Sequence, residues 1–199
     1  DCWPFTGHCV YYQNAECDKW KTECRHCPLI RQYPASLFLD RSKENYHKKK
    51  ELFTGIEDMT LIVPSHWLEK QVRESFLKEY PIRVIYNGID LETYHPTVGD
   101  FRERNHLQDK FIVLGVANVW SERKGLATFL QLAQNLGEEY QVVLVGLDKE
   151  QIEALPGNVL GLPRTDTPTE LAEIYTAADV FLNPGREETF GLNVAEAMA

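Results

Sequence analysis

The chain has 199 residues, of which 43% are hydrophobic and 26% charged, and its formal net charge is −9. This length allows one or two domains, and the composition is that of an ordinary globular protein. No run of 18 apolar residues predicts a transmembrane helix. The acidic balance argues against general nucleic-acid binding, which depends on the neutralisation of phosphates.

The first 34 residues hold every cysteine of the chain. All five cysteines lie between residues 2 and 27, in a segment also rich in Trp, Tyr and Pro. The segment has no clear hydrophobic period, which predicts an irregular loop or insertion. The spacing C-x7-C-x6-C-x2-C suits a structural zinc ion held by Cys9, Cys17, Cys24 and Cys27.

Three alternatives for this cysteine cluster stay open. His8 or His26 could replace one of the cysteines as a zinc ligand. The cysteines could instead be reduced and buried without a metal. A disulfide is the remaining alternative, and a reducing cytosol would disfavour it.

The next part of the chain alternates helix and strand. Residues 39–53 predict a charged helix, and residues 60–63 predict a short strand. Ser65 is a suitable cap for a helix that runs to Leu77. Residues 82–86 predict a second strand. This order predicts the end of a parallel α/β lobe.

A second lobe follows the polar residues 91–109, which predict a linker. Its predicted strands are 111–118, 141–146, 159–162 and 180–183, and its predicted helices are 124–136, 149–155 and 167–178. Strands that alternate with helices predict a doubly wound α/β lobe. Ligands of such sheets bind at the carboxyl ends of the strands.

Two carboxylates stand eight residues apart near the end of the sequence. Glu188 is expected in a loop, and Glu196 about a turn and a half inside the helix that follows. Free N–H groups at a helix start attract anions such as diphosphates, and carboxylates accept hydrogen bonds from sugar hydroxyls. The alternative is an acidic helix start that only stabilises the helix.

Four landmarks carry a family resemblance. Residues 183–196 contain the E-x7-E pattern, residues 84–90 read V-x-x-N-G-I-D, residues 63–68 contain V-P-S, and Arg123-Lys124-Gly125 follows a hydrophobic strand. In this order the set resembles the family-4 retaining glycosyltransferases, over residues 60 to 199. The Cys-rich start is most similar to bacterial polysaccharide-building members.

The resemblance implies an α/β, GT-B-like fold of two Rossmann-type lobes. Residues 1–92 would form the C-terminal part of the acceptor-side lobe, with the Cys-rich segment 1–34 at its start. Residues 93–199 would form the N-terminal part of the lobe that binds the nucleotide-sugar donor. We therefore expect both lobes to be incomplete and the sequence to be a part of a longer protein.

The resemblance also implies roles for residues around the donor. Lys124 would neutralise the leaving diphosphate, with Arg123 beside it, since Val119 stands where the family usually has an arginine. Glu188 would contact the donor sugar and Glu196 the ribose. Glu188 and Lys124 are thus the expected catalytic residues, although a solvated helix lysine is the alternative for Lys124.

The remaining implied contacts are less specific. The backbone of Phe190, Gly191 and Leu192 would approach the sugar and diphosphate, since Gly191 has no side chain to block it. Arg164 would lie near the base, or be an ordinary surface arginine. Asp1 would be the aspartate of the family's His-Asp pair in the acceptor lobe.

The function implied is sugar transfer, with retention, from a nucleotide sugar to a glycan or lipid-linked acceptor in capsule or exopolysaccharide biosynthesis. No cofactor is expected in the chemistry. The expected location is the cytoplasm, with peripheral contact at the inner face of the membrane through the basic residues 41–50, which could instead be a solvated helix face. A non-catalytic nucleotide or nucleotide-sugar binding module is the alternative function.

Overall fold

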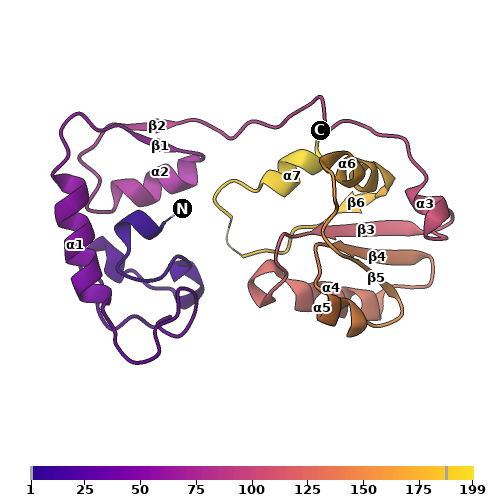
Figure 1. Cartoon of the computed structure of the whole chain (residues 1–199), viewed down its shortest axis with the longest axis horizontal. Helices are drawn as coiled ribbons and strands as arrows, with labels where there is room; N and C mark the ends of the chain where they lie inside the picture. The colour runs from indigo at the N-terminus through magenta and orange to yellow at the C-terminus, as the bar shows by residue number, and fades with distance from the viewer. Residues whose placement is uncertain (1, 187) are drawn as a thin grey trace. The chain divides into compact units, whose positions relative to one another are not determined.

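The computed structural model describes residues 2–186 and 188–199. Contacts divide the described chain into two units, one of residues 2–87 with 188–190 and one of residues 88–186 with 191–199. Each unit is described by itself, and Figure 1 gives the labels of its helices and strands. Asp1 lies outside the described residues.

The first unit begins with an irregular segment, as its sequence predicts. Three short 3-10 turns span Trp3–Phe5, Tyr12–Ala15 and Lys19–Lys21, and no α-helix or strand precedes Ser42 in the described part of this segment. Phe5, Tyr12 and Trp20 are buried there, and the Trp20 ring centroid lies 5.0 Å from each of the other two. These aromatic residues come from turns, so their packing leaves no period in the sequence.

Two parallel strands and two helices complete this unit. α1 spans Ser42–Thr54, β1 Leu61–Val63, α2 His66–Arg73 and β2 Ile82–Val84. The Ser65 hydroxyl accepts a 3.2 Å hydrogen bond from the Leu68 N–H and caps α2, as predicted. α2 ends four residues before Leu77, however. The buried Ser75 hydroxyl donates to the Val72 carbonyl and accepts from the Leu77 N–H, which forms a turn in place of further helix.

A four-stranded parallel sheet in the order β5-β4-β3-β6 forms the second unit. The strands are β3 Phe111–Val116, β4 Tyr140–Val145, β5 Val159–Leu162 and β6 Val180–Phe181. The α/β fold predicted from the sequence is confirmed. Its long apolar runs reflect burial on both faces of the sheet.

Successive strand residues enter different cores. Val113 packs in the core with α4 (Leu126–Asn135) and α5 (Lys149–Glu153). Ile112 and Leu114 pack in the core with α3 (Phe101–Arg104) and α6 (Pro168–Ala177). Figure 1 shows α4 and α5 on one face of the sheet and α6 on the other.

α3 was not predicted, because its four residues lie in a segment that reads as a polar linker. Phe101 is nevertheless only 4% exposed and anchors α3 in the core. Arg102 next to it forms a 2.7 Å ion pair with Asp179, whose carboxylate also accepts a 2.7 Å hydrogen bond from the Ile112 N–H. Asp179 directly precedes β6, so its carboxylate links the start of β6 to both α3 and β3.

Candidate functional site

Two loops meet at the carboxyl ends of the neighbouring strands β3 and β6. A Cβ on Gly125, in the loop after β3, would lie 2.5 Å from Cγ of Pro184, in the loop after β6. The Arg186 N–H also donates to the Arg123 carbonyl at 3.5 Å. Gly125 has a φ of +79°, which glycine adopts at little cost. The fold thus brings both loops together at the carboxyl ends of the strands.

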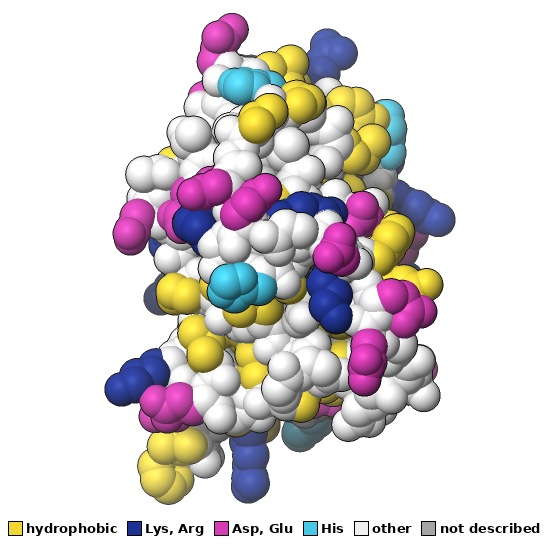
Figure 2. Space-filling view, turned by 90° about the vertical axis from the view of Figure 1, so that its right-hand side faces the viewer, with side chains coloured by type: hydrophobic (Ala, Val, Ile, Leu, Met, Phe, Trp, Pro, Cys, Tyr) yellow, Lys and Arg dark blue, Asp and Glu magenta, His cyan; other side chains and the backbone are white. Residues whose placement is uncertain are grey.

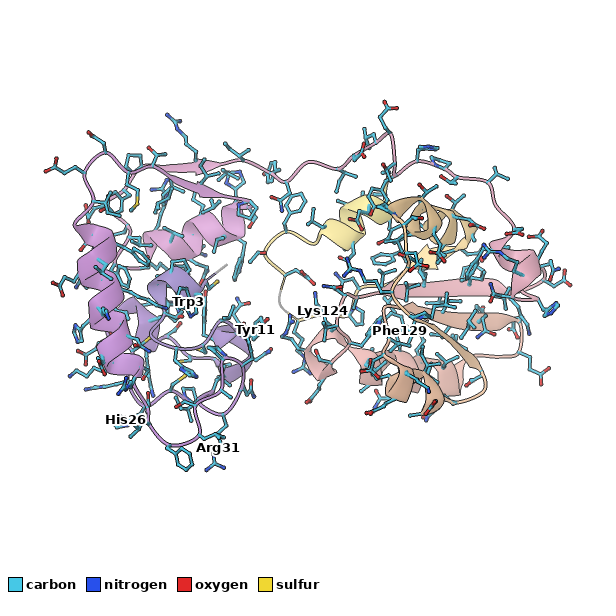
Figure 3. The ribbon with its side chains drawn as sticks, viewed as in Figure 1. Trp3, Tyr11, His26, Arg31, Lys124 and Phe129 are labelled. Atoms are coloured by element: carbon cyan, nitrogen blue, oxygen red, sulfur yellow. The ribbon has the colours of Figure 1, made fainter. Side chains whose placement is uncertain are left out.

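Arg123 and Lys124 lie in the first of these loops. They end a 3-10 turn, Glu122–Lys124, and Gly125 then separates this turn from α4. The helix predicted over 124–136 is therefore split, because the left-handed conformation of Gly125 interrupts it. Figure 3 labels Lys124 on this turn. Both basic side chains are partly buried, and each takes part in polar or electrostatic interactions.

The start of α7 (Leu192–Ala197) is fixed to the same strand end. Gly191 is buried, has a φ of +81° and precedes the first residue of the helix. The Asn193 side-chain amide donates a 2.9 Å hydrogen bond to the Val116 carbonyl, the last residue of β3. Leu192 is exposed. Sequence reasoning missed Asn193, since an asparagine two residues after a glycine also suits an ordinary helix start.

Glu196 is held by tyrosine side chains inside the second unit. The Tyr175 hydroxyl donates a 3.2 Å hydrogen bond to its carboxylate. Burial, and then the Glu196 charge, raise the pKa of Tyr175, and the same two causes raise the pKa of Tyr94. These three side chains line a cavity of about 240 Å³ together with His95. No local sequence signal connects the tyrosines to Glu196.

Arg164 lies elsewhere on this sheet. It is exposed and follows β5, the edge strand two positions from β3. Glu188 and Phe190 are grouped with the first unit, so they are not placed relative to Lys124. Glu188 is exposed, and the Phe190 ring centroid lies 6.1 Å from that of Tyr86.

Comparison with known proteins decides the family. Residues 99–199 match the model of the family described as glycosyl transferases group 1. The chain belongs to this family. The matched region of the chain contains the whole four-stranded sheet, both touching loops and α7.

Two curated relatives are similar to this chain. The processive diacylglycerol alpha-glucosyltransferase of Acholeplasma laidlawii is 25% identical over 166 residues, which cover 77% of this chain and 49% of that protein. The putative colanic acid biosynthesis glycosyl transferase WcaC of Escherichia coli is 33% identical over 98 residues, or 47% of this chain and 22% of that protein. The chain thus spans half or less of the length of these relatives.

Solved structures share the fold of this chain. Sucrose-phosphate synthase from Thermosynechococcus elongatus has a TM-score of 0.64 and 25% identity, over 87% of this chain and 46% of that one. HepE of Anabaena, solved with UDP and glucose, has a TM-score of 0.56 and 22% identity, over 76% of this chain and 46% of that one. The likeness shows a GT-B fold with Rossmann-like lobes.

The basic residues 41–50 are less available for contact with a membrane than the sequence suggests. Lys43 and His47 each lie within 3.3 Å of the Glu23 carboxylate. The Lys49 ammonium lies 3.5 Å from the Trp3 ring centroid and donates to the Thr6 carbonyl at 2.9 Å. Figure 2 draws a different surface, the side that carries α3 in Figure 1, and there acidic and basic side chains are interspersed. No helix in the described residues is long and apolar enough to cross a membrane.

Four of the cysteines form a second candidate site, in the first unit. Cys9, Cys17, Cys24 and Cys27 line one cavity of about 10 Å³, and His8 lines it too. All five cysteines are free thiols. His26 is exposed and is not among the lining residues. In the described part of the chain, no three His, Cys, Asp or Glu side chains already form a metal-binding group.

Proposed function

We propose that the intact protein transfers a sugar from a nucleotide-sugar donor to a glycan or lipid-linked acceptor, with retention at the anomeric carbon. The observation that carries this proposal is the family match over residues 99–199. HepE has been solved with UDP-glucose, and WcaC is named for colanic acid biosynthesis. The first supports a nucleotide-sugar donor, and the second supports a role in bacterial polysaccharide biosynthesis, as in a capsule or exopolysaccharide.

In this proposal, Lys124 and Arg123 neutralise the leaving diphosphate. They stand at the carboxyl end of a central parallel strand, where ligands of such sheets bind. Positive charge placed where negative charge develops lowers the barrier to transfer. The backbone of Phe190, Gly191 and Leu192 approaches the sugar and diphosphate. The buried, left-handed Gly191 gives that segment a conformation that a side chain would strain.

The two carboxylates of the E-x7-E motif bind hydroxyl groups in this proposal. Glu188 contacts the donor sugar, and Glu196 contacts the ribose. The hydrogen bond from Tyr175 holds one Glu196 oxygen, and a carboxylate has several further lone pairs for a ribose hydroxyl. Arg164 lies toward the base. No metal or other cofactor takes part in the chemistry.

The proposed location is the cytoplasm, at the inner face of the cell membrane when the acceptor is lipid-linked. The candidates for contact with anionic lipid are Lys48 and Lys50, which are basic residues on α1. The contacts of Lys43 and His47 with the Glu23 carboxylate leave those two residues less able to contribute. The acceptor-side role of residues 1–92 and the donor-side role of residues 93–199 belong to the same proposal.

A donor screen with the intact protein tests the proposed function. The purified protein is incubated with nucleoside-diphosphate sugars and an extract of lipid-linked acceptors, and released nucleoside diphosphate is measured. One donor should be consumed in an acceptor-dependent way, and nuclear magnetic resonance of the product should show the anomeric configuration of the donor. Tight donor binding without turnover would instead indicate a non-catalytic binding module. An inverted product would contradict retention.

A further inference from the structure

We propose that Cys9, Cys17, Cys24 and Cys27 bind one structural zinc ion in the first unit. The four thiolates would form a closed tetrahedral set, with zinc–sulfur distances of about 2.3 Å. Such a centre has no open position for substrate, so its role is to hold the irregular segment together. The proposal is independent of the sugar-transfer chemistry.

Backbone turns bring the four cysteines to one place. They come from a segment of the sequence without strand or α-helix, yet all four line the same small cavity. Glu16 and His26 directly precede Cys17 and Cys27, and both have a left-handed φ of +47°. That conformation is uncommon for residues other than glycine. Two such residues cost conformational free energy. Binding of one metal ion by the four cysteines would offset this cost.

Backbone N–H groups already point at two of the sulfurs. The Gly7 N–H donates to Cys24 Sγ at 3.2 Å. The backbone N–H of Leu29, two residues after Cys27, donates to the Cys27 sulfur. Hydrogen bonds of this kind stabilise a thiolate more than a thiol. The thiolate is the form that binds metal.

Cys9 and Cys27 share one hydrogen bond. This contact places two of the four cavity-lining sulfurs next to each other, with one proton between them. A zinc ion would take the place of that proton, and the protons lost from the other thiols would pass to solvent.

The surroundings of the cavity suit a centre of net negative charge. Four thiolates and one Zn²⁺ sum to a charge of −2. Lys19 and Arg25 line the cavity, and the Lys49 ammonium is close enough to interact with the Cys24 and Cys9 sulfurs. Charged partners of opposite sign reduce the cost of burying such a centre.

Two buried polar atoms give an independent indication. His8 Nε2 and Trp20 Nε1 are buried and have no hydrogen-bond partner among the described residues, and both residues line this cavity. Trp20 is only 1% exposed, so water cannot easily serve its N–H group. Buried polar groups in native proteins nearly always have a partner. Sulfurs that are drawn together as thiolates would offer the acceptor that the Trp20 N–H lacks.

Size also favours a single ion. The cavity of about 10 Å³ is close to the volume that one water-sized particle needs. Among the described residues, the four cysteine side chains are not placed as a metal-coordinating group. Zinc binding therefore requires rotation about their Cα–Cβ bonds, which would bring the four sulfurs within bonding distance of the ion.

Metal analysis and metal exchange test the proposal. The intact protein, purified without added metal, should contain about one zinc per chain. Exchange with Co²⁺ should give the visible absorption of tetrahedral cobalt bound by thiolates. A chelator should release the zinc and make the four cavity thiols reactive. Cys17→Ser and Cys27→Ser should each lose most of the bound zinc.

Cys2→Ser is the matched control. Cys2 is buried like Cys9, but its thiol donates to the Tyr12 hydroxyl and it is not among the residues that line the cavity. This variant should keep its zinc. Folded wild-type protein that is zinc-free with reactive cavity thiols would overturn the proposal, as would a mass that increases on reduction, which indicates a disulfide. The wild-type measurements decide the matter even where a cysteine variant does not fold.

Discussion

The hydroxyl of Tyr175 donates a 3.2 Å hydrogen bond to the carboxylate of Glu196. Tyr175 belongs to α6 and Glu196 to α7, so this bond joins the helix before β6 to the helix after it. Burial and the nearby carboxylate raise the pKa of Tyr175, so the phenol stays protonated and a donor at neutral and moderately alkaline pH. The orientation of Glu196 therefore depends on a residue outside the E-x7-E motif.

Tyr175→Phe should weaken donor binding more than it slows transfer. The variant loses a hydrogen bond worth about 0.5–1.5 kcal/mol, and the ring still fills its place. We expect the KM for the donor to rise several-fold, with little change in kcat. Tyr140→Phe is the control. Tyr140 is the first residue of β4, whereas the candidate donor site lies at the carboxyl ends of the strands. Equal KM values for both variants would show that Tyr175 does not position Glu196.

Gly125→Ala should destabilise the second unit. The added methyl would lie 2.5 Å from Pro184, at a φ of +79° that alanine disfavours. Strain and overpacking together should lower the free energy of unfolding by about 1–3 kcal/mol. Urea unfolding measures this change. Gly157→Ala provides the comparison, because a Cβ there meets no atom within 4 Å; a similar loss in that variant would refute this account of the loop contact.

Asp179→Asn should reduce stability in a pH-dependent way. Although burial acts in the opposite direction, the Ile112 N–H and the Arg102 guanidinium lower the pKa of Asp179. Its stabilisation is therefore present above the ordinary aspartate pKa of about 3.9, and it is lost as pH falls through the lower folded value. Since the side chain is about a third exposed (34%), we expect a loss of about 1–2 kcal/mol at pH 7.

The measurement is urea unfolding of wild type and Asp179→Asn at several pH values. The difference between the two proteins should shrink toward acid, because protonation removes the charge from the wild-type carboxylate. The exposed Asp109 offers a matched control as Asp109→Asn. A difference for Asp179→Asn that stays constant down to pH 3 would contradict the proposed charge interaction.

Local sequence signals predicted the sheet well. β5 has the same bounds in sequence and structure, since a short apolar run there ends at a proline. Residues 167–170 read T-P-T-E, the pattern of a capping box with proline at the first helical position. The Thr167 hydroxyl accepts from the Glu170 N–H, as this pattern predicts, but the Glu170 side chain accepts from the Asp166 N–H instead of that of Thr167. Period and capping are local, so they can be read from neighbouring residues.

Features that depend on contacts between residues far apart in the sequence could not be predicted. The helix α3 exists because Phe101 reaches a core built by residues far along the chain. The partner of Glu196 is 21 residues away in another helix. The common cavity of the cysteines depends on two left-handed turns, which the residue types of Glu16 and His26 do not require. The spacing of the motifs predicts candidate donor-binding residues such as Glu196. It does not predict the side chains that orient them, such as Tyr175.

The rate of nucleoside diphosphate release by Lys124→Ala tests the central claim most directly. Removing one group that stabilises developing charge typically costs on the order of 100- to 1,000-fold in rate, and the intact variant should show a loss of that size with its fold retained. Lys149→Ala is the control, because the Lys149 side chain is 88% exposed on α5, and it should release nucleoside diphosphate at the wild-type rate. Wild-type turnover by Lys124→Ala would contradict the placement of the donor diphosphate at the end of β3.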